Sequence, residues 1–328
     1  MAQRSVRPII ARAIVAAVTG MCSTPVVAAA QDYPTRPVRV LVAFAAGGFA
    51  DSTARLIGQR LAEQLGQPFV IDNRSGAGGN IAAKTTAEAA PDGYTLLVHT
   101  AASGINATLA VNPGFDLLKD LTPVANTVSA AGLWIVLPAH PAANLQDLIR
   151  MSKGKRLNYA TAGVGTSSHI AGDYLLRVLA GLDAVHIAFK GGAPALAALL
   201  GNQVELLSAS GSAAIPLIKQ GRLKALGVSS LKRTATLPDV PTVSEAGFPG
   251  FEERSWVGYF APARTSAAVV ALLNREINQA LAHSDVKSRF IAQGMELHPG
   301  SAADFARYVR AEVALWAKII KTTGVKAE

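Results

Sequence analysis

The groups best suited to chemistry in this chain are backbone N–H groups, which three glycine-rich turns expose. Their sequences are AAGGFADSTAR at 45–55, NRSGAGGN at 73–80 and NYATAGVGTSSHIAG at 158–172. Each turn follows an apolar run and opens a helical pattern, so unpaired N–H groups and the positive end of a helix dipole face whatever lies before it. Such turns bind small anions, and a carboxylate is the expected ligand.

The segments around these turns predict an α/β fold. Apolar runs at 38–44, 68–72 and 94–99 indicate strands, and the residues at 51–65 and 81–90 have helical spacing. This alternation is typical of a mostly parallel sheet with helices on both faces. Ligand sites in such sheets lie at the carboxyl ends of the strands.

The same alternation recurs downstream and indicates a second α/β unit. Further strands are expected at 133–137, 157–160, 185–189, 204–208, 225–229 and 256–260. Further helices are expected at 144–151, 166–180, 194–200, 213–220, 267–282, 286–293 and 302–321. We therefore expect two domains, with the return crossing near 253–256. Domain 1 would comprise 31–131 and 255–328, and domain 2 would comprise 132–254.

Residues 1–30 have the pattern of a secretory signal peptide. A basic segment at 4–12 precedes a short apolar stretch at 13–21, and three alanines at 28–30 offer a cleavage site. A lipid anchor on Cys22 is the alternative, but a methionine stands just before it where lipoprotein processing expects a small residue. We expect an exported protein that begins near Gln31 and acts in the periplasm.

Charge and composition argue against several classes of protein. The formal net charge is +9, and removing the three arginines of the first thirty residues leaves +6, a surface that attracts anions. The basic residues are scattered and aromatic residues are few, so no surface suited to nucleic acid is visible. The only cysteine, Cys22, would leave with the signal, and no paired histidines have ligand spacing. We expect no metal, no cofactor and no nucleic-acid partner.

Five segments in a characteristic order resemble the Bug or TctC family, the substrate-binding proteins of tripartite tricarboxylate transporters. They are AAGGFADSTAR, VIDNRSGAGGNIAA, PDGYTLL, LNYATAGVGTSSHIAG and HIAFKGGAPALAALLGNQVEL. The resemblance covers essentially the whole mature chain. It implies a periplasmic-binding-protein-like fold of the Venus flytrap type, in which two α/β domains joined by two crossing strands close over a small carboxylate. It also implies delivery to the membrane subunits of such a transporter, and we expect a monomer.

The resemblance, taken residue by residue, implies two ligand-binding loops in opposing domains. The first comprises Ala46, Gly47, Gly48, Phe49, Ala50 and Asp51. The second comprises Thr161, Ala162, Gly163, Gly165, Thr166, Ser167 and His169. Lys190 adds a positive charge before Gly191. Backbone N–H groups and hydroxyls of the two loops would hold the ligand, in part through ordered water.

Some of these residues also have purely structural explanations. Asp51 is better placed to cap its helix or to pair with Arg55 than to touch a ligand. His169 stands at the mouth of the predicted site and could respond to pH, or it could face solvent. The pair at 78–79 could serve a tight turn as readily as a ligand, and Arg74 could form a surface ion pair instead of meeting a carboxylate.

Two departures from the family pattern bear on the ligand. Ala46 stands where the family usually has a proline, and Ser208, Ala209 and Ser210 occupy a stretch where an acidic residue is common. Without that carboxylate, an amino group on the ligand would have one partner fewer. The sequence therefore favours a ligand with acid, hydroxyl or aromatic groups over an amino acid.

The motifs of common enzyme classes are incomplete in this sequence. The segment GAGGNIAAKTT at 76–86 resembles a phosphate-binding loop, but Ala83 replaces the glycine required before the lysine. No Gly-x-Ser-x-Gly motif occurs, and nothing places a histidine beside a nucleophile. We expect binding without catalysis. A periplasmic sensor that presents a carboxylate to a signalling partner is the main alternative, and a periplasmic hydrolase is a weaker one.

Overall fold

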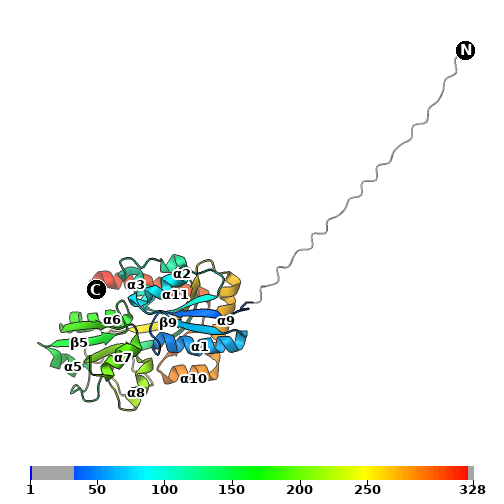
Figure 1. Cartoon of the computed structure of the whole chain (residues 1–328). Coiled ribbons are helices and arrows are strands. Elements are labelled where there is room, and N and C mark those ends of the chain that lie inside the picture. The colour runs from blue at the N-terminus through cyan, green and yellow to red at the C-terminus, as the bar shows by residue number, and fades with distance from the viewer. Residues whose placement is uncertain (2–32, 324–328) are drawn as a thin grey trace. The chain divides into compact units, whose positions relative to one another are not determined.

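A curved β-sheet organises the molecule (Figure 1). The computed structural model describes Met1 and residues 33–323, so the predicted signal peptide at 1–30 and the predicted start at Gln31 lie outside the described residues. Within the described part, ten strands form the sheet in the order β2-β1-β3-β9-β4-β7-β5-β6, and β10 and β8 also pair with β4. Helices cover the sheet, so the predicted α/β class is confirmed.

One part of the sheet, called the first half below, carries the first two glycine-rich turns. Its strands are β1 (Val38–Val42), β2 (Phe69–Asn73), β3 (Thr95–Thr100), β9 (Arg254–Pro262) and β10 (Glu296–Leu297). Its helices are α1 (Phe49–Leu65), α2 (Asn80–Ala87), α3 (Ala102–Leu109), α4 (Leu117–Asp120), α9 (Ala267–Ala282), α10 (Ser284–Ala292) and α11 (Ala302–Thr323), with a 3₁₀ turn η1 (Ala77–Gly79). Because β1 pairs in parallel with both β2 and β3, the predicted alternation of parallel strands and helices is confirmed here.

The other part, called the second half, carries the third glycine-rich turn. Its strands are β5 (Arg156–Thr161), β6 (Asp183–Ala188), β7 (Leu206–Ser210) and β8 (Lys224–Val228). Its helices are α5 (Leu145–Ser152), α6 (Ser167–Gly172), α7 (Gly192–Leu200) and α8 (Ile215–Lys219), with a π-helical segment η2 (Asp173–Leu179) and a 3₁₀ turn η3 (Gly211–Ala213). β5 pairs in parallel with β6 and β7, as its pattern predicts.

Of the described strands, β4 (Leu121–Val136) alone belongs to both halves. It pairs with β9 as far as Ala131, which lies opposite Arg254, and then with β7 from Gly132, which lies opposite Ser210. The chain therefore passes from one half to the other at this point, beside the start of β9. We keep the division into two domains at 131/132 and 254/255 as a proposal.

Besides the short elements α4 and β10, most of β4 and all of α3 could not be seen in the sequence. Only the end of β4 was predicted as a strand, because its earlier residues include Pro123 and Asn126, and the register of β4 against β9 shifts near both. α3 was not predicted, because its sequence ASGINATL is short and rich in small residues and lacks a clear helical repeat of apolar side chains.

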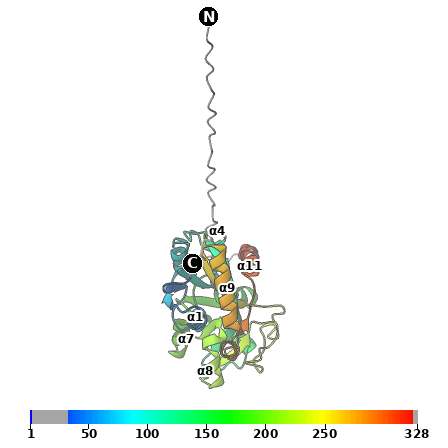
Figure 2. The same ribbon diagram turned by 90° about the vertical axis from the view of Figure 1, so that its right-hand side faces the viewer.

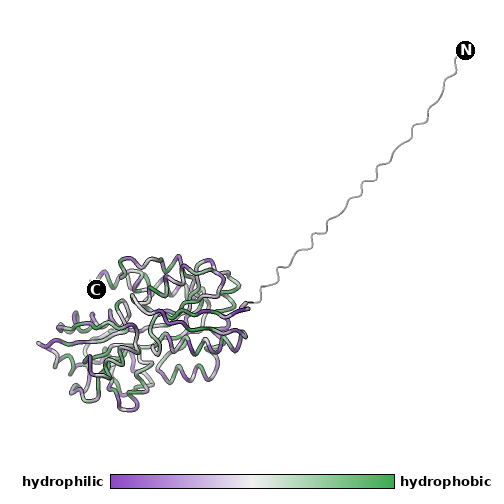
Figure 3. Tube along the Cα trace, in the orientation of Figure 1, coloured by the Kyte–Doolittle hydropathy of each residue, from purple (hydrophilic) through white to green (hydrophobic). Residues whose placement is uncertain are grey.

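The core forms where helices cover both faces of the strands. Val38, Val40, Leu41 and Val42 of β1 have no exposed surface, which is typical of a parallel strand covered on both sides. α1 packs against β2 and α9 (Figure 2), and α3 packs against α11 (Figure 1). Apolar and polar stretches alternate along the helices, as expected when one face of each is buried (Figure 3). None of the helices within 33–323 combines the length and the apolar character needed to cross a membrane.

Candidate functional site

Asp51 holds the first glycine-rich loop, which joins β1 to α1. Its side chain is buried, and Oδ2 accepts hydrogen bonds from the Gly47 N–H (2.8 Å) and from Arg55 Nε (2.9 Å). Oδ1 accepts from Asn73 Nδ2 (3.0 Å). The predicted ion pair with Arg55 is confirmed. Gly48, the N-cap of α1, gives the first helical turn no side-chain hydrogen bond, which leaves the N–H groups of that turn to a ligand or to water.

The Asp51 carboxylate stays ionised at neutral pH. Burial on its own would raise its pKa, but the hydrogen bonds from Arg55, Gly47 and Asn73 outweigh burial and hold the pKa below its ordinary value. The negative charge of Asp51 is therefore held by hydrogen bonds from the loop and its neighbours. Contact between Asp51 and a ligand stays a prediction.

Hydroxyl groups hold the third glycine-rich turn, which joins β5 to α6. This turn is called the second glycine-rich loop below, and the turn between β1 and α1 is the first. Thr166, the N-cap of α6, donates from Oγ1 to the Gly163 carbonyl (2.7 Å) and accepts from the His169 N–H (3.3 Å). Thr161 Oγ1 accepts from the Gly163 N–H (3.2 Å). Gly163 has a φ of +140°, a conformation that residues with a side chain rarely adopt. Two threonines and a glycine thus fix the shape of this loop.

Two stacked histidines support the second loop. His169 is 1% exposed, its Nδ1 accepts from the Gly165 N–H (3.2 Å), and its Nε2 lies 3.6 Å from Asp173 Oδ2. Its ring lies 4.1 Å from the ring of His186, centroid to centroid, and His186 Nε2 lies 2.6 Å from Thr161 Oγ1. Burial, and secondly the neighbouring His169, lower the pKa of His186 to about 3. The alternative that His169 faces solvent is wrong, because its ring is buried against the loop.

The loops of the two halves meet directly. The Ala45 N–H, at the start of the first loop, donates to the Lys190 carbonyl (2.9 Å), and Asn106 Nδ2 donates to the Gly165 carbonyl (3.2 Å). Asn106 Nδ2 also lies within hydrogen-bond distance of the Gly78 carbonyl (3.3 Å). Lys190 is exposed and contributes its backbone to this contact. The two halves are therefore closed on each other at the glycine-rich turns.

Two cavities at this junction have a volume of more than about 10 Å³. The smaller, of about 40 Å³, is lined by Phe44, Gly48, Phe49, Ala50, Thr100 and Ser255 and, from the second half, by Ala162, Thr166, Ser167, Ser168, Gly192, Ala209 and Ser210. The other, of about 210 Å³, is lined by Phe44 and residues 76–79, 162–164 and 188–190. Neither lining contains an aspartate or a glutamate, so an anion there meets backbone dipoles, hydroxyls and one lysine. No group of three or more potential metal ligands occurs among the described residues.

The predicted site residues divide into two groups. Those that line the cavities are Gly48, Phe49, Ala50, Ala162, Gly163, Thr166, Ser167 and Lys190. Those that line neither cavity are Ala46, Gly47, Asp51, Thr161, Gly165 and His169. Except for the exposed Ala46, the members of the second group belong to the hydrogen-bond networks that shape the two loops.

Five polar residues at the junction were not predicted as site residues. They are Thr100, Asn106, Ser168, Ser210 and Ser255. Ser168 follows a predicted site residue, and Ser255 lies within the predicted crossing at 253–256, so both could have been proposed from their positions. Asn106 could not, because α3 itself was not predicted.

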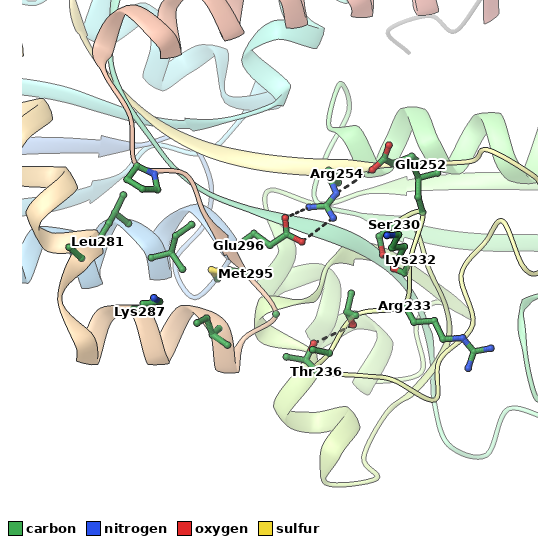
Figure 4. A pocket seen from close by; sticks show the side chains of 18 residues that line it. Ser230, Lys232, Arg233, Thr236, Glu252, Arg254, Leu281, Lys287, Met295 and Glu296 are labelled. Atoms are coloured by element: carbon green, nitrogen blue, oxygen red, sulfur yellow. Dashed lines mark hydrogen bonds and ion pairs between the residues drawn. The ribbon is translucent and has the colours of Figure 1, made fainter.

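A larger cavity, of about 990 Å³, shares no lining residue with the junction (Figure 4). This groove is lined by residues 230–236 and by α10 and its flanks. Its Arg254 already pairs with Glu296 (2.7 Å) and Glu252 (3.3 Å), and no glycine-rich turn lines it. Since the groups that favour an anion lie at the junction, we take the junction as the candidate site.

Known proteins are similar to this chain in fold and in sequence. The model of the TctC family, described as the tripartite tricarboxylate transporter family receptor, matches residues 53–325. A UPF0065 protein of Bordetella bronchiseptica is 39% identical over 301 residues, which cover 91% of this chain and 89% of the relative.

Three solved structures are similar over most of the chain. The periplasmic binding protein BugD is 35% identical with a TM-score of 0.86, covering 90% of this chain and 100% of that one. MatC from Rhodopseudomonas palustris, solved with bound malate, is 35% identical with a TM-score of 0.83, covering 88% and 100%. An R. palustris protein solved with adipate is 36% identical with a TM-score of 0.86, covering 90% and 99%.

These matches define a periplasmic-type solute-binding protein. The chain belongs to the TctC family and is of the Bug type, so the resemblance seen in the sequence and the fold it implied are confirmed.

Proposed function

We propose that this protein captures a small dicarboxylate between its two glycine-rich loops and delivers it to the membrane subunits of a tripartite tricarboxylate-type transporter. The observation that carries the proposal is the meeting of two strand-to-helix turns from opposite halves around cavities free of acidic side chains. One is the uncapped start of the 17-residue helix α1, and the other is rich in hydroxyl groups.

The two sides of the junction suit different parts of a ligand. The N–H groups of the first turn of α1, at Phe49 and Ala50, would hold one carboxylate. The hydroxyls of Ser167, Ser168 and Ser210 can donate or accept, so they suit a second carboxylate or a hydroxyl group. Dipoles in a site that excludes water stabilise an anion without a paired cation.

The proteins solved with malate and with adipate support a dicarboxylate as the ligand class. No carboxylate lines the junction cavities, and Ser208, Ala209 and Ser210 occupy the stretch where the family commonly has an acid. An amino group would therefore lack a partner, which favours malate-like or adipate-like acids over amino acids.

Binding would couple to movement of the two halves. The smaller cavity, of about 40 Å³, holds little more than water, so a dicarboxylate requires the halves to separate and close again around it. A ligand that contacts both loops stabilises the closed form by its difference in affinity for the two forms. A micromolar dissociation constant corresponds to about 8 kcal/mol, which a few charge-assisted hydrogen bonds in a dry site can supply.

The mature protein would begin near Gln31, act as a periplasmic monomer and catalyse no reaction. A sensor that presents its bound carboxylate to a signalling partner would use the same site. Carboxylate uptake by cells with and without the gene, compared with carboxylate-dependent transcription, separates transport from sensing.

The test of the binding function is a thermal-shift screen of the chain from Gln31 onwards. The panel contains malate, adipate, citrate, an aromatic acid and aspartate. A ligand at a hundred times its dissociation constant stabilises the folded state by about 2.7 kcal/mol, so malate or adipate should raise the Tm saturably and aspartate less. A panel without any saturable shift, on protein shown to be free of ligand, would contradict the proposal.

A further inference from the structure

Glu253 places a buried carboxyl group where the chain crosses between the two halves. It is 5% exposed, and its Oε2 accepts no hydrogen bond that meets normal geometry from the described residues. The Glu253 N–H donates to the Ser229 carbonyl (2.8 Å), and the Glu253 carbonyl accepts from the Gly132 N–H (3.3 Å). The residue therefore lies between β4 and the segment that returns from the second half to β9.

The crossing strand is shaped to receive this carboxyl group. A Cβ atom at Gly132 would collide with Glu253 Oε2, so only glycine leaves room for the side chain in its present position. Gly132 is also the residue at which β4 leaves β9 and joins β7. A change in the angle between the halves must therefore alter the surroundings of Glu253.

The same carboxyl group is linked to the second glycine-rich loop. The side chain of Ser167 lies close enough to the Glu253 carboxyl group to oppose the rise in its pKa, and Ser167 is both the first residue of α6 and part of the lining of the smaller junction cavity. Glu253 thus connects the crossing point with a predicted ligand-binding residue.

No opposite charge near Glu253 compensates for the burial of its carboxyl group. Its neighbours Glu252 and Arg254 line the large groove, where Arg254 pairs with Glu252 and Glu296 (Figure 4). Burial raises the pKa of Glu253 to about 7, and the weaker opposing effects of Ser167, the Gly132 backbone and Arg254 do not cancel it. On α6, His169 Nε2 lies 3.6 Å from Asp173 Oδ2, and its ring stacks on that of His186.

We propose that Glu253 couples ligand binding to proton uptake, being protonated when the halves close on a carboxylate and ionised when they open. This inference rests on the proposed function. Closing buries the carboxyl group, and an anionic ligand near Ser167 disfavours a second negative charge; both effects favour the neutral acid. Opening would hydrate the group and return it to ordinary titration.

The sign of the pH dependence follows from the two pKa values. If the pKa is the ordinary 4.5 in the open form and about 7 in the closed form, closing is favoured fully below pH 4.5 and loses this contribution as the pH rises through 7. Between pH 6 and pH 8, affinity should fall about tenfold from this group alone.

The experiment is a calorimetric titration of adipate or malate at pH 6.5, in buffers of different ionisation enthalpy. The wild-type protein should take up roughly half a proton or more per ligand. Glu253→Gln should take up almost none and should lose the tenfold weakening from pH 6 to pH 8. Glu252→Gln, a change at the exposed neighbouring carboxylate, is the matched control and should behave as wild type. Equal proton uptake by wild type and Glu253→Gln overturns the inference.

A ligand-free measurement separates this inference from the proposed function. In the ligand-free wild-type protein, small-angle X-ray scattering should show a more closed form at pH 5 than at pH 8, because protonation of Glu253 favours closing, and Glu253→Gln should show no such change. If no carboxylate binds but this difference is present, the proposed function fails and the inference for Glu253 stands. Equal scattering by wild type at the two pH values overturns the inference. If the variant does not fold, the wild-type protein alone tests the inference: binding without proton uptake at pH 6.5 overturns it.

Discussion

The first and second glycine-rich loops share one plan but are held by different chemistry. In the first, the Asp51 carboxylate binds the Gly47 N–H and is itself held by Arg55 and Asn73. In the second, the ring of His169 accepts from the Gly165 N–H. In both, a buried side chain that does not line a junction cavity fixes the glycine backbone. The comparison teaches that a backbone anion site needs a buried group to hold its shape.

The two kinds of support respond differently to acid. Asp51, whose pKa is held below its ordinary value, keeps the first loop in place in neutral and mildly acidic solution. The second loop rests in part on the imidazole of His186, which is neutral in the folded state because burial lowers its pKa. Mild acid should therefore affect the second loop before the first.

Blocking the first loop should have the largest effect on binding. Gly48→Val places a side chain at the cavity wall without strained backbone, because Gly48 has a φ of −86°. We expect about a 100-fold loss of affinity, or ~2.7 kcal/mol, with little change in Tm. Calorimetry and thermal unfolding measure the two. Gly300→Val, in an open surface position, is the control and should bind normally.

The corresponding change in the second loop should damage the fold as well. Gly163→Val would force a β-branched residue into a φ of +140° and bring its Cβ within 3.0 Å of the Phe189 carbonyl. We expect lost affinity together with a lower Tm. Normal affinity in both glycine variants would remove the junction as the ligand site.

Removing the support of the first loop should cost stability more than affinity. Asp51→Asn weakens three hydrogen bonds around a buried carboxylate, so the free energy of unfolding should fall by about 1–3 kcal/mol in urea titrations. Affinity should fall less than tenfold. A large loss of affinity at unchanged stability would show that Asp51 touches the ligand.

His186, which supports the second loop, should make the stability of the protein depend on pH. Because the folded-state pKa of His186 lies below the ordinary 6.5, its contribution to stability is complete above pH 6.5 and is lost as the pH falls towards 3. Between pH 6.5 and pH 4.5, wild type should lose about 1–2 kcal/mol relative to His186→Asn. Urea unfolding at several pH values measures the difference, in which the opposite contribution of Glu253 cancels. Parallel curves would show that His186 does not titrate in this way.

Removing a hydrogen bond between the two halves should have the smallest effect on affinity. Asn106→Ala removes the hydrogen bond to the Gly165 carbonyl, worth about 1 kcal/mol, so affinity should fall about fivefold through faster release. Asn278→Ala, which changes an amide bonded within the first half, is the control and should leave release unchanged. Equal release rates for both variants would show that Asn106 does not hold the closed form.

The sequence predicted the elements that have strong patterns. The parallel strands around β1 and β5 and the helix Ala267–Ala282 could be found because apolar runs and helical spacing reflect burial directly. The glycine-rich loops could be found because a positive φ restricts the choice of residue. β4 could not, because its first part owes its place to pairing with β9, a segment more than a hundred residues away.

The features of the site that could not be predicted also depend on contacts between segments far apart in the sequence. The burial of His169 depends on its stacking with His186 from β6, and the contact of Asn106 depends on closure of the two halves. Glu253 was invisible as a special residue, because a glutamate between a glutamate and an arginine is typical of a solvated surface. Only the fold turns Glu253 inwards while its neighbours line the groove.

The central claim is that the ligand lies at the glycine junction and not in the larger groove. The most direct test is one calorimetric comparison, with the best carboxylate from the screen, of wild type, Gly48→Val at the junction and Lys287→Ala in the groove. We predict that binding is lost in Gly48→Val and unchanged in Lys287→Ala. Unchanged affinity in Gly48→Val together with lost affinity in Lys287→Ala would contradict the account and move the site to the groove.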